Sequence, residues 1–317
     1  MINVDIVTGF LGAGKTTFIR AMMESKSWAD EKWAIVVNEF GKVGIDGSFL
    51  ETAADVSVVE ISNGCLCCTL KGDFLEALRK LAVEYEPDRI IIEPSGIFVL
   101  ADLADMFDQP VLAGVCRIHA IVTIVDPGQF ISQRMKYNYF LESQIRHASI
   151  LVLSKTGNCE EILVSRTLEG LKALNGEAVI LTEPWEDFDF LWFRELLDGV
   201  QVHPPLPADE ARNRVESPHA DEIDIQSFGL TDARDMTSSA YHEMLEGMRQ
   251  GDFGDVLRVK GFLRVDGVMR VVNYSAGDLP EPGAISSDRA ARISVIGSRL
   301  HYGKLTRMFW RIPKALL

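Results

Sequence analysis

Residues 9–16 read Gly9-Phe10-Leu11-Gly12-Ala13-Gly14-Lys15-Thr16 and fill every fixed position of the phosphate-loop pattern G-x-x-x-x-G-K-[ST]. An apolar run, residues 2–7, precedes this loop, and a helical run, residues 18–23, follows it. The glycines let backbone N–H groups turn toward phosphate oxygens, and the positive end of the new helix adds to their effect. Lys15 reaches the outer phosphates, and the Thr16 hydroxyl is a ligand for Mg²⁺. The stretch therefore predicts a site for a nucleoside triphosphate.

Length and composition favour a globular protein with a large core and a second, smaller one. The chain has 317 residues, 47 % of them hydrophobic, and we find no apolar run long enough to cross a bilayer. The first strand starts at once and leaves no room for a signal peptide, so we expect a cytoplasmic protein without a membrane partner. A formal net charge of −14 argues against a nucleic-acid partner.

Charge is distributed unevenly along the chain. From Asp255 to the C-terminus there are 11 basic and 5 acidic residues, which gives +6 there and −20 in the remainder. One interpretation is that a basic C-terminal module docks on an acidic N-terminal domain, and another is that the module docks an acidic partner.

Strand-like and helix-like segments alternate over the first 200 residues, which is typical of a parallel sheet covered by helices. We predict strands at 2–7, 33–37, 56–59, 89–92, 118–125, 150–153 and 178–181, and helices at 73–84 and 160–173. The expected fold is α/β, with a P-loop NTPase domain over residues 1–202 that has a mostly parallel sheet flanked by helices.

A proline-rich polar stretch, residues 203–221, predicts a linker, and the pattern changes after it. Strands are expected at 223–228 and 293–296, helices at 238–248 and 304–309, and a hairpin of 256–265 and 268–274 around Asp266-Gly267. Residues 222–317 are thus predicted to form a small α+β domain with a mainly antiparallel sheet.

Two further motifs follow predicted strands. Asn38-Glu39-Phe40-Gly41, with Asp46 downstream, suits a loop that senses the γ-phosphate, although the tetrapeptide alone is weak support. In Glu93-Pro94-Ser95-Gly96 the acid can orient the Mg²⁺ ligands and the glycine N–H can bind the γ-phosphate; a plain turn that ends the strand is the alternative.

Three of the five cysteines form the cluster Cys65-Leu66-Cys67-Cys68, just before a predicted helix start, where a thiol pKa is lowered. Three sulfurs suit Zn²⁺, Cu⁺ or a similar thiophilic ion, with a carboxylate or solvent as fourth ligand. A buried thiol cluster and a redox switch are the alternatives. We expect Cys116 and Cys159 to be ordinary core residues.

The order of these four motifs resembles the CobW family of GTPases, a metallochaperone group related to the urease and hydrogenase maturation GTPases. The resemblance covers nearly the whole chain, since residues 257–262 and 294–297 are similar to the C-terminal domain of that family. It implies GTP, Mg²⁺ and a transition metal such as Zn²⁺ or Co²⁺ as ligands, and a client metalloprotein as partner. A nucleotide-dependent homodimer is left open.

The resemblance also implies residue roles. Nucleotide contacts fall to Gly9, Gly12, Ala13, Gly14, Lys15, Thr16, Thr17, Asn38, Gly96, Ser154 and Lys155. Thr16 and Glu93 take the Mg²⁺, and Cys65, Cys67 and Cys68 with Glu39 take the transition metal. The predicted catalytic groups are Lys15, Thr16, Glu39 and Glu93, with Glu39 and Asp46 as candidates to activate water.

The chain departs from the family in three places. Ser154-Lys155-Thr156-Gly157 replaces the guanine-reading motif Asn-Lys-x-Asp, so the carboxylate that would bind guanine is missing unless Asn158 or Glu160 substitutes for it. Lys42 replaces a common glutamate near the cysteines, and the linker has only His203 and His219 where many relatives are His-rich. GTP is therefore favoured by the family and not by these side chains.

The leading hypothesis is a slow, nucleotide-gated GTPase that acts as a metallochaperone or metalloenzyme activator. Its Cys-x-Cys-Cys metal site would be coupled to the switch loops, that is, to the loops that sense the γ-phosphate. A small-molecule kinase could use the same phosphate loop but would leave the cysteines unexplained. A nucleotide-binding regulator without hydrolysis is the third reading.

Overall fold

The computed structural model describes residues 1–38, 57–61, 71–100, 106–202, 225–275, 283–284 and 290–310. The chain divides into two compact units, the first within residues 1–217 for the most part and the second mainly within residues 218–317. Each unit has its own sheet and its own apolar core.

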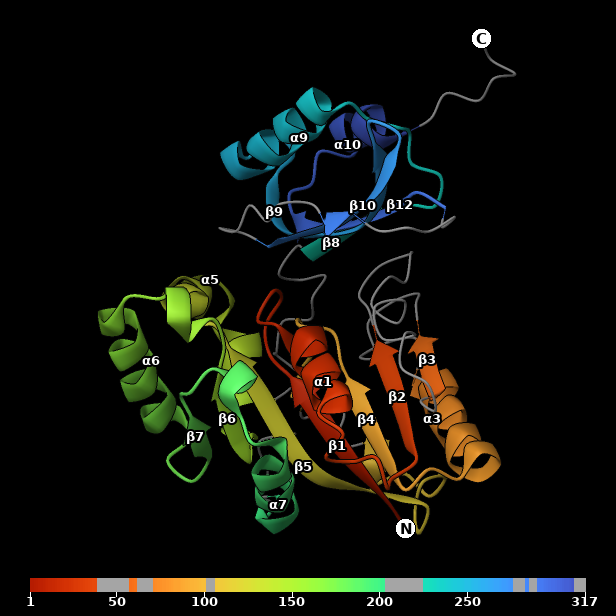
Figure 1. Ribbon diagram of the computed structural model, residues 1–317, viewed down its shortest axis with the longest axis vertical. Helices are drawn as coiled ribbons and strands as arrows, with labels where there is room; N and C mark the ends of the chain where they lie inside the picture. The colour runs from red at the N-terminus through yellow and green to blue at the C-terminus, as the bar shows by residue number, and fades with distance from the viewer. Residues whose placement is uncertain are drawn as a thin grey trace. The chain divides into compact units, whose positions relative to one another are not determined.

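The first unit is built on a seven-stranded sheet in which every pair of neighbouring strands is parallel (Figure 1). Its order is β3-β2-β4-β1-β5-β6-β7. The strands are β1 (Ile2–Thr8), β2 (Trp33–Asn38), β3 (Ser57–Ile61), β4 (Arg89–Glu93), β5 (Cys116–Val125), β6 (Ile150–Leu153) and β7 (Val179–Leu181). All of them lie within two residues of the predicted strands. Because the strands are parallel, their carboxyl ends share one edge of the sheet.

Helices cover both faces of this sheet. They are α1 (Lys15–Glu24), α3 (Lys71–Lys80) with a π-helical turn at Leu81–Tyr85, α5 (Pro127–Arg146), α6 (Glu161–Leu174) and α7 (Phe190–Gly199), with short 3₁₀ turns at Thr156–Asn158 and Trp185–Asp187. Adjacent residues of β1 point to opposite cores, since Ile6 packs with Phe74 of α3 whereas Val7 packs with Phe18 of α1 and Phe193 of α7. No helix in the described ranges is long and apolar enough to span a membrane.

The second unit contains a five-stranded antiparallel sheet of order β11-β10-β9-β12-β8. Its strands are β8 (Ile225–Leu230), β9 (Asp255–Val265), β10 (Val268–Ser275), β11 (Gly283–Ala284) and β12 (Arg292–Ser298), and its helices are α9 (Ser238–Gln250) and α10 (Tyr302–Phe309). Both helices share an apolar core with the sheet through Met244 and Phe309. The predicted hairpin is confirmed, with Asp266 at φ 48° and Gly267 at φ 80°, as a two-residue type I′ turn requires. The predicted fold class is thus confirmed for both units.

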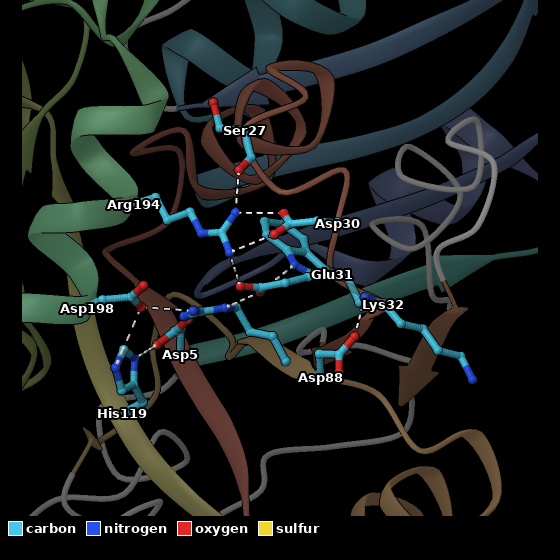
Figure 2. Close-up of polar contacts among 11 residues, drawn as sticks. Asp5, Ser27, Asp30, Glu31, Lys32, Asp88, His119, Arg194 and Asp198 are labelled. Carbon is cyan, nitrogen blue, oxygen red and sulfur yellow. Dashed lines mark hydrogen bonds and ion pairs between the residues drawn. The ribbon is translucent and has the colours of Figure 1, made fainter.

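A buried cluster of charges fastens α7 to the N-terminal ends of the strands. Arg89, at the start of β4, is 3 % exposed and binds three carboxylates: Nη1 lies 2.5 Å from Asp5 Oδ2, Nε 2.8 Å from Glu31 Oε2, and Nη2 2.8 Å from Asp198 Oδ1 on α7. Burial opposes the charged guanidinium, but the three carboxylates outweigh it and raise the pKa of Arg89. His119 Nδ1 is 2.8 Å from Asp5 Oδ1 and extends the cluster to β5 (Figure 2).

A second arginine of α7 strengthens this attachment. Arg194 donates to the Ser27 carbonyl at 2.7 Å and pairs with Asp30 and Glu31, each at 2.7 Å (Figure 2). Glu31 therefore accepts from both arginines, one on the sheet and one on the helix. This network lies at the edge of the sheet opposite the phosphate loop.

Candidate functional site

The phosphate loop joins β1 to α1 through three glycines in conformations that other residues rarely adopt. Gly9, Gly12 and Gly14 have φ of 141°, 80° and 104°. A Cβ at Gly9 would lie 2.3 Å from the Ile124 carbonyl oxygen, and one at Gly14 would lie 2.9 Å from the Trp185 ring. The loop thus passes so close to its neighbours that only glycine fits at positions 9 and 14.

The Lys15 ammonium lies across this loop. Its side chain is buried, and Nζ donates to the carbonyl oxygen of Gly9 at 2.9 Å and of Phe10 at 3.3 Å. The loop carbonyls therefore hold the cation above the turn that the glycines form. A cation in that place adds positive charge to the N-terminal end of α1, which already favours anions.

Thr16 and Glu93 come from different elements and meet at the carboxyl edge of the sheet. The Thr16 hydroxyl donates to Glu93 Oε1 at 2.9 Å, although the two residues are 77 positions apart. Glu93 ends β4 and is only 2 % exposed. A hydroxyl and a carboxylate placed together offer the hard oxygen ligands that Mg²⁺ prefers, so these residues fit the ion predicted for them.

The turn after β4 touches the phosphate loop. A Cβ at Gly96 would lie 2.5 Å from the Leu11 backbone nitrogen, so any larger residue would force the two loops apart. Gln144 of α5 fixes this turn, because its fully buried Nε2 donates to the carbonyl oxygens of Gly96 and Phe98 at 3.1 Å each. Sequence analysis did not find Gln144. Its two partners precede it by 48 and 46 positions, and no local pattern marks it as their hydrogen-bond donor.

Lys155 and Asp126 form an ion pair where β5 and β6 end. Lys155 Nζ is 2.9 Å from Asp126 Oδ2, and Lys155 has φ 55°. Asp126 also caps α5, since its Oδ1 accepts from the Gly128 N–H at 2.9 Å. Sequence analysis missed Asp126, although an acid directly after a buried strand and before Pro127 was an available signal. Ser154 is buried beside it and bonds the Val125 carbonyl.

Gly157 stands where the resemblance expects a carboxylate. A Cβ at this position would meet no atom within 4 Å, so a side chain there would enter open space. Glu160 precedes α6, and its side chain makes no capping hydrogen bond. The side chain of Asn158 lies outside the described residues.

The predicted metal ligands Cys65, Cys67, Cys68 and Glu39, together with Lys42 and Asp46, lie outside the described residues, so this site stays a prediction. Within the described ranges no group of three His, Cys, Asp or Glu side chains could hold a metal ion. The remaining thiols are free: burial raises the pKa of Cys116 to about 11, and burial also raises the pKa of Cys159.

The structure thus brings most described site residues to one edge of one sheet. Lys15, Thr16 and Thr17 begin α1, Asn38 ends β2 with 2 % exposure, and Gly96, Ser154 and Lys155 follow β4 and β6. The topology explains this convergence, because β2, β4, β1, β5 and β6 are consecutive neighbours in a parallel sheet. Direct contacts link Thr16 to Glu93 and Gly96 to the loop; Lys155 pairs with Asp126.

Comparisons with known proteins match both units. The family model for the CobW/HypB/UreG nucleotide-binding domain matches residues 3–182, and that for the cobalamin synthesis protein cobW C-terminal domain matches residues 225–312. A Pseudomonas aeruginosa protein named zinc chaperone CobW is 33 % identical over 195 residues, 52 % of each chain. A Sinorhizobium protein of the same name is 28 % identical over 313 residues, with 87 % of this chain and 85 % of the relative covered.

The chain therefore spans about half the length of the Pseudomonas relative and most of the Sinorhizobium one. Among solved structures, Zn(II)-bound YjiA GTPase from E. coli matches over 97 % of both chains, at 21 % identity and a TM-score of 0.47.

Proposed function

Because the chain belongs to the CobW family, as its motifs predict, we propose that it is a GTP-dependent metallochaperone that delivers Zn²⁺ to a client metalloprotein. The observation that carries this proposal is the contact of Thr16 with Glu93 at 2.9 Å, because it joins the residue after Lys15 to the end of β4, whose following turn at Gly96 touches the phosphate loop. Relatives named as zinc chaperones support the metal.

In this proposal the phosphate loop binds the triphosphate and Lys15 neutralises the charge of its outer oxygens. Thr16 and Glu93 hold Mg²⁺, which would offset charge on the phosphates when bound. Gly96 presents its N–H to the γ-phosphate, and Gln144 keeps that turn in place. The turn that would sense the γ-phosphate is thus tied to α5 by two hydrogen bonds.

Zinc is the cargo, and we propose that Cys65, Cys67, Cys68 and Glu39 bind it. β3 lies three strand spacings from β1, with β2 and β4 between them, which corresponds to about 14 Å at the usual strand spacing. The cysteine motif follows β3 in sequence, and Glu39 directly follows β2. β2 and β3 both end at the sheet edge that carries the phosphate loop, which supports coupling of zinc affinity to the nucleotide.

Separate substitutions test the two parts of this function. Lys15→Ala should abolish GTP binding or hydrolysis and leave zinc stoichiometry in the nucleotide-free protein unchanged. Serine at all three cysteines should abolish tight zinc binding and leave GTP affinity unchanged. Cys159→Ser is the matched control, because this thiol lies outside the cluster, and it should change neither. Loss of GTP binding in the triple cysteine variant, or full zinc binding by it, would contradict the proposal.

A further inference from the structure

A groove runs between α5 and α6 on the outside of the first unit. It has a volume of about 380 Å³, and Phe130, 2 % exposed, contributes to its lining. Next to the groove, Gly170 of α6 lets the two helices pack closely, since a Cβ at position 170 would lie 2.7 Å from the Phe130 ring. Ile131 and Met135 of α5 and Arg166 of α6 also line the groove.

Large apolar side chains around this groove are left in solvent. Met135 is 84 % exposed and Ile131 37 %, and their spacing of four residues places them on one side of α5. Ile162, four residues before Arg166 on α6 and outside the groove lining, is also 54 % exposed. Such a cluster is typical of a surface that binds another protein, and a flexible methionine adapts to different partners. A groove so open does not enclose a small molecule.

The charge beside the groove is positive in a chain whose formal charge is −14. Arg134 and Arg166 line the groove with one acid, Glu142. Glu142 is already bound, 3.2 Å from Arg146 and 3.8 Å from Arg134. Arg166 makes no ion pair with any residue that the structure describes. The occupant that fits these side chains is therefore an acidic segment with an apolar face.

The groove is also linked to the phosphate loop. The α5 helix is interrupted at Tyr137, which has φ −132° and ψ 32°, two residues after Met135. The Tyr137 ring stacks on Phe10 of the phosphate loop, with ring centroids 5.2 Å apart and an angle of 26° between the planes. A segment bound in the groove would thus lie on the helix that contacts the nucleotide loop.

We propose that this groove docks an acidic amphipathic helix of the client protein. Apolar side chains of that helix would cover Ile131 and Met135, and its carboxylates would pair with Arg166, the lining arginine that is not already paired with Glu142. The proposal rests on the proposed function, because the client is the protein that receives the zinc.

The probe is a fluorescein-labelled synthetic peptide of about 16 residues, helical, with leucines at i, i+3, i+4 and i+7 and glutamates beside them. Its affinity for the full-length protein is measured by fluorescence anisotropy. Arg166→Glu should weaken binding roughly fivefold or more, and Met135→Glu should do the same. Lys172→Glu is the matched control, since this exposed lysine of α6 does not line the groove, and it should leave the affinity within about twofold.

Labelled methionine methyl groups locate the peptide. Of the ten methionines, Met135 should shift when the peptide is added, whereas Met22, on the buried face of α1 at 1 % exposure, should not. GTP binding by the same samples reports the proposed function separately, because Arg166 is outside the nucleotide site. A peptide that fails to bind, equal losses in Arg166→Glu and Lys172→Glu, or self-association through this face in sedimentation would each overturn the proposal.

Discussion

Replacing Arg89 by methionine should destabilise the first unit more than any single change on its surface. The substitution keeps a long side chain but leaves Asp5, which is 1 % exposed, as a buried carboxylate without its guanidinium. Glu31 and Asp198 lose the same partner, at 2.8 Å each. Removing one member of a buried ion pair typically costs about 3–5 kcal/mol, because the remaining charge stays out of water.

For a unit of this size we expect the melting temperature to fall by roughly 6–20 °C. Tryptophan fluorescence follows the transition, because four of the five tryptophans, Trp28, Trp33, Trp185 and Trp192, belong to the first unit. Thermal scans of the full chain at one protein concentration and one pH therefore report mainly this unit.

Arg117→Met is the matched control. Arg117 lies in β5 of the same sheet, but it is exposed, and among the described residues its side chain donates only to Asn3 Oδ1 at 2.9 Å. Its loss should cost no more than about 0.5 kcal/mol. The double variant Asp5→Asn with Arg89→Met should recover part of the lost unfolding free energy, because no unpaired buried carboxylate then remains at position 5. Equal melting temperatures for Arg89→Met and Arg117→Met would refute the reasoning.

Three further predictions concern the nucleotide site and the pH range of stability. Glu93→Gln should lower GTP hydrolysis about 10- to 100-fold and raise the Mg²⁺ concentration it needs, whereas exposed Glu195→Gln should not; equal Mg²⁺ dependence would exclude Glu93 from the metal site. Gly157→Asp should raise the preference for GTP over ATP in competition binding by about 10-fold or more, because the new carboxylate enters open space beside Lys155; an unchanged preference would mean that the base lies elsewhere. Burial raises the pKa of Cys116 from 9.0 to about 11, so the unfolded thiol ionises first, and roughly 3 kcal/mol of stability present below pH 9 should be lost as pH rises to 11. Denaturant titrations of Cys116→Ala should show a flatter decline over this range, and a decline as steep as that of the unmodified chain would contradict the assignment.

The strands of the first unit follow from short-range sequence patterns. A buried parallel strand reads as a continuous apolar run, and β4 and β6 differ from their predicted bounds by no more than one residue. The phosphate loop could be predicted equally well, because the spacing of its glycines and Lys15 specify it within eight residues. Where backbone and side-chain chemistry are local, sequence suffices.

The parts that sequence analysis missed depend on distant contacts. Helix α5 opens with Pro127-Gly128 and is interrupted at Tyr137, so its apolar residues do not form one regular stripe. Helix α7 is fastened by Arg194 and Asp198 to residues more than 100 positions away. Asp126 and Gln144 act on loops from other strands for the same reason. No local pattern predicts such partners, which only the folded sheet brings together.

The most direct test of the proposed gating is the zinc affinity of the full chain in two nucleotide states. Competition with a fluorescent zinc chelator gives the dissociation constant with GDP and with a non-hydrolysable GTP analogue, each with Mg²⁺. Coupling of the usual size predicts affinities that differ about 5- to 150-fold. Equal affinities in both states, with nucleotide binding verified in the same samples, would contradict the claim that the phosphate loop controls the zinc site.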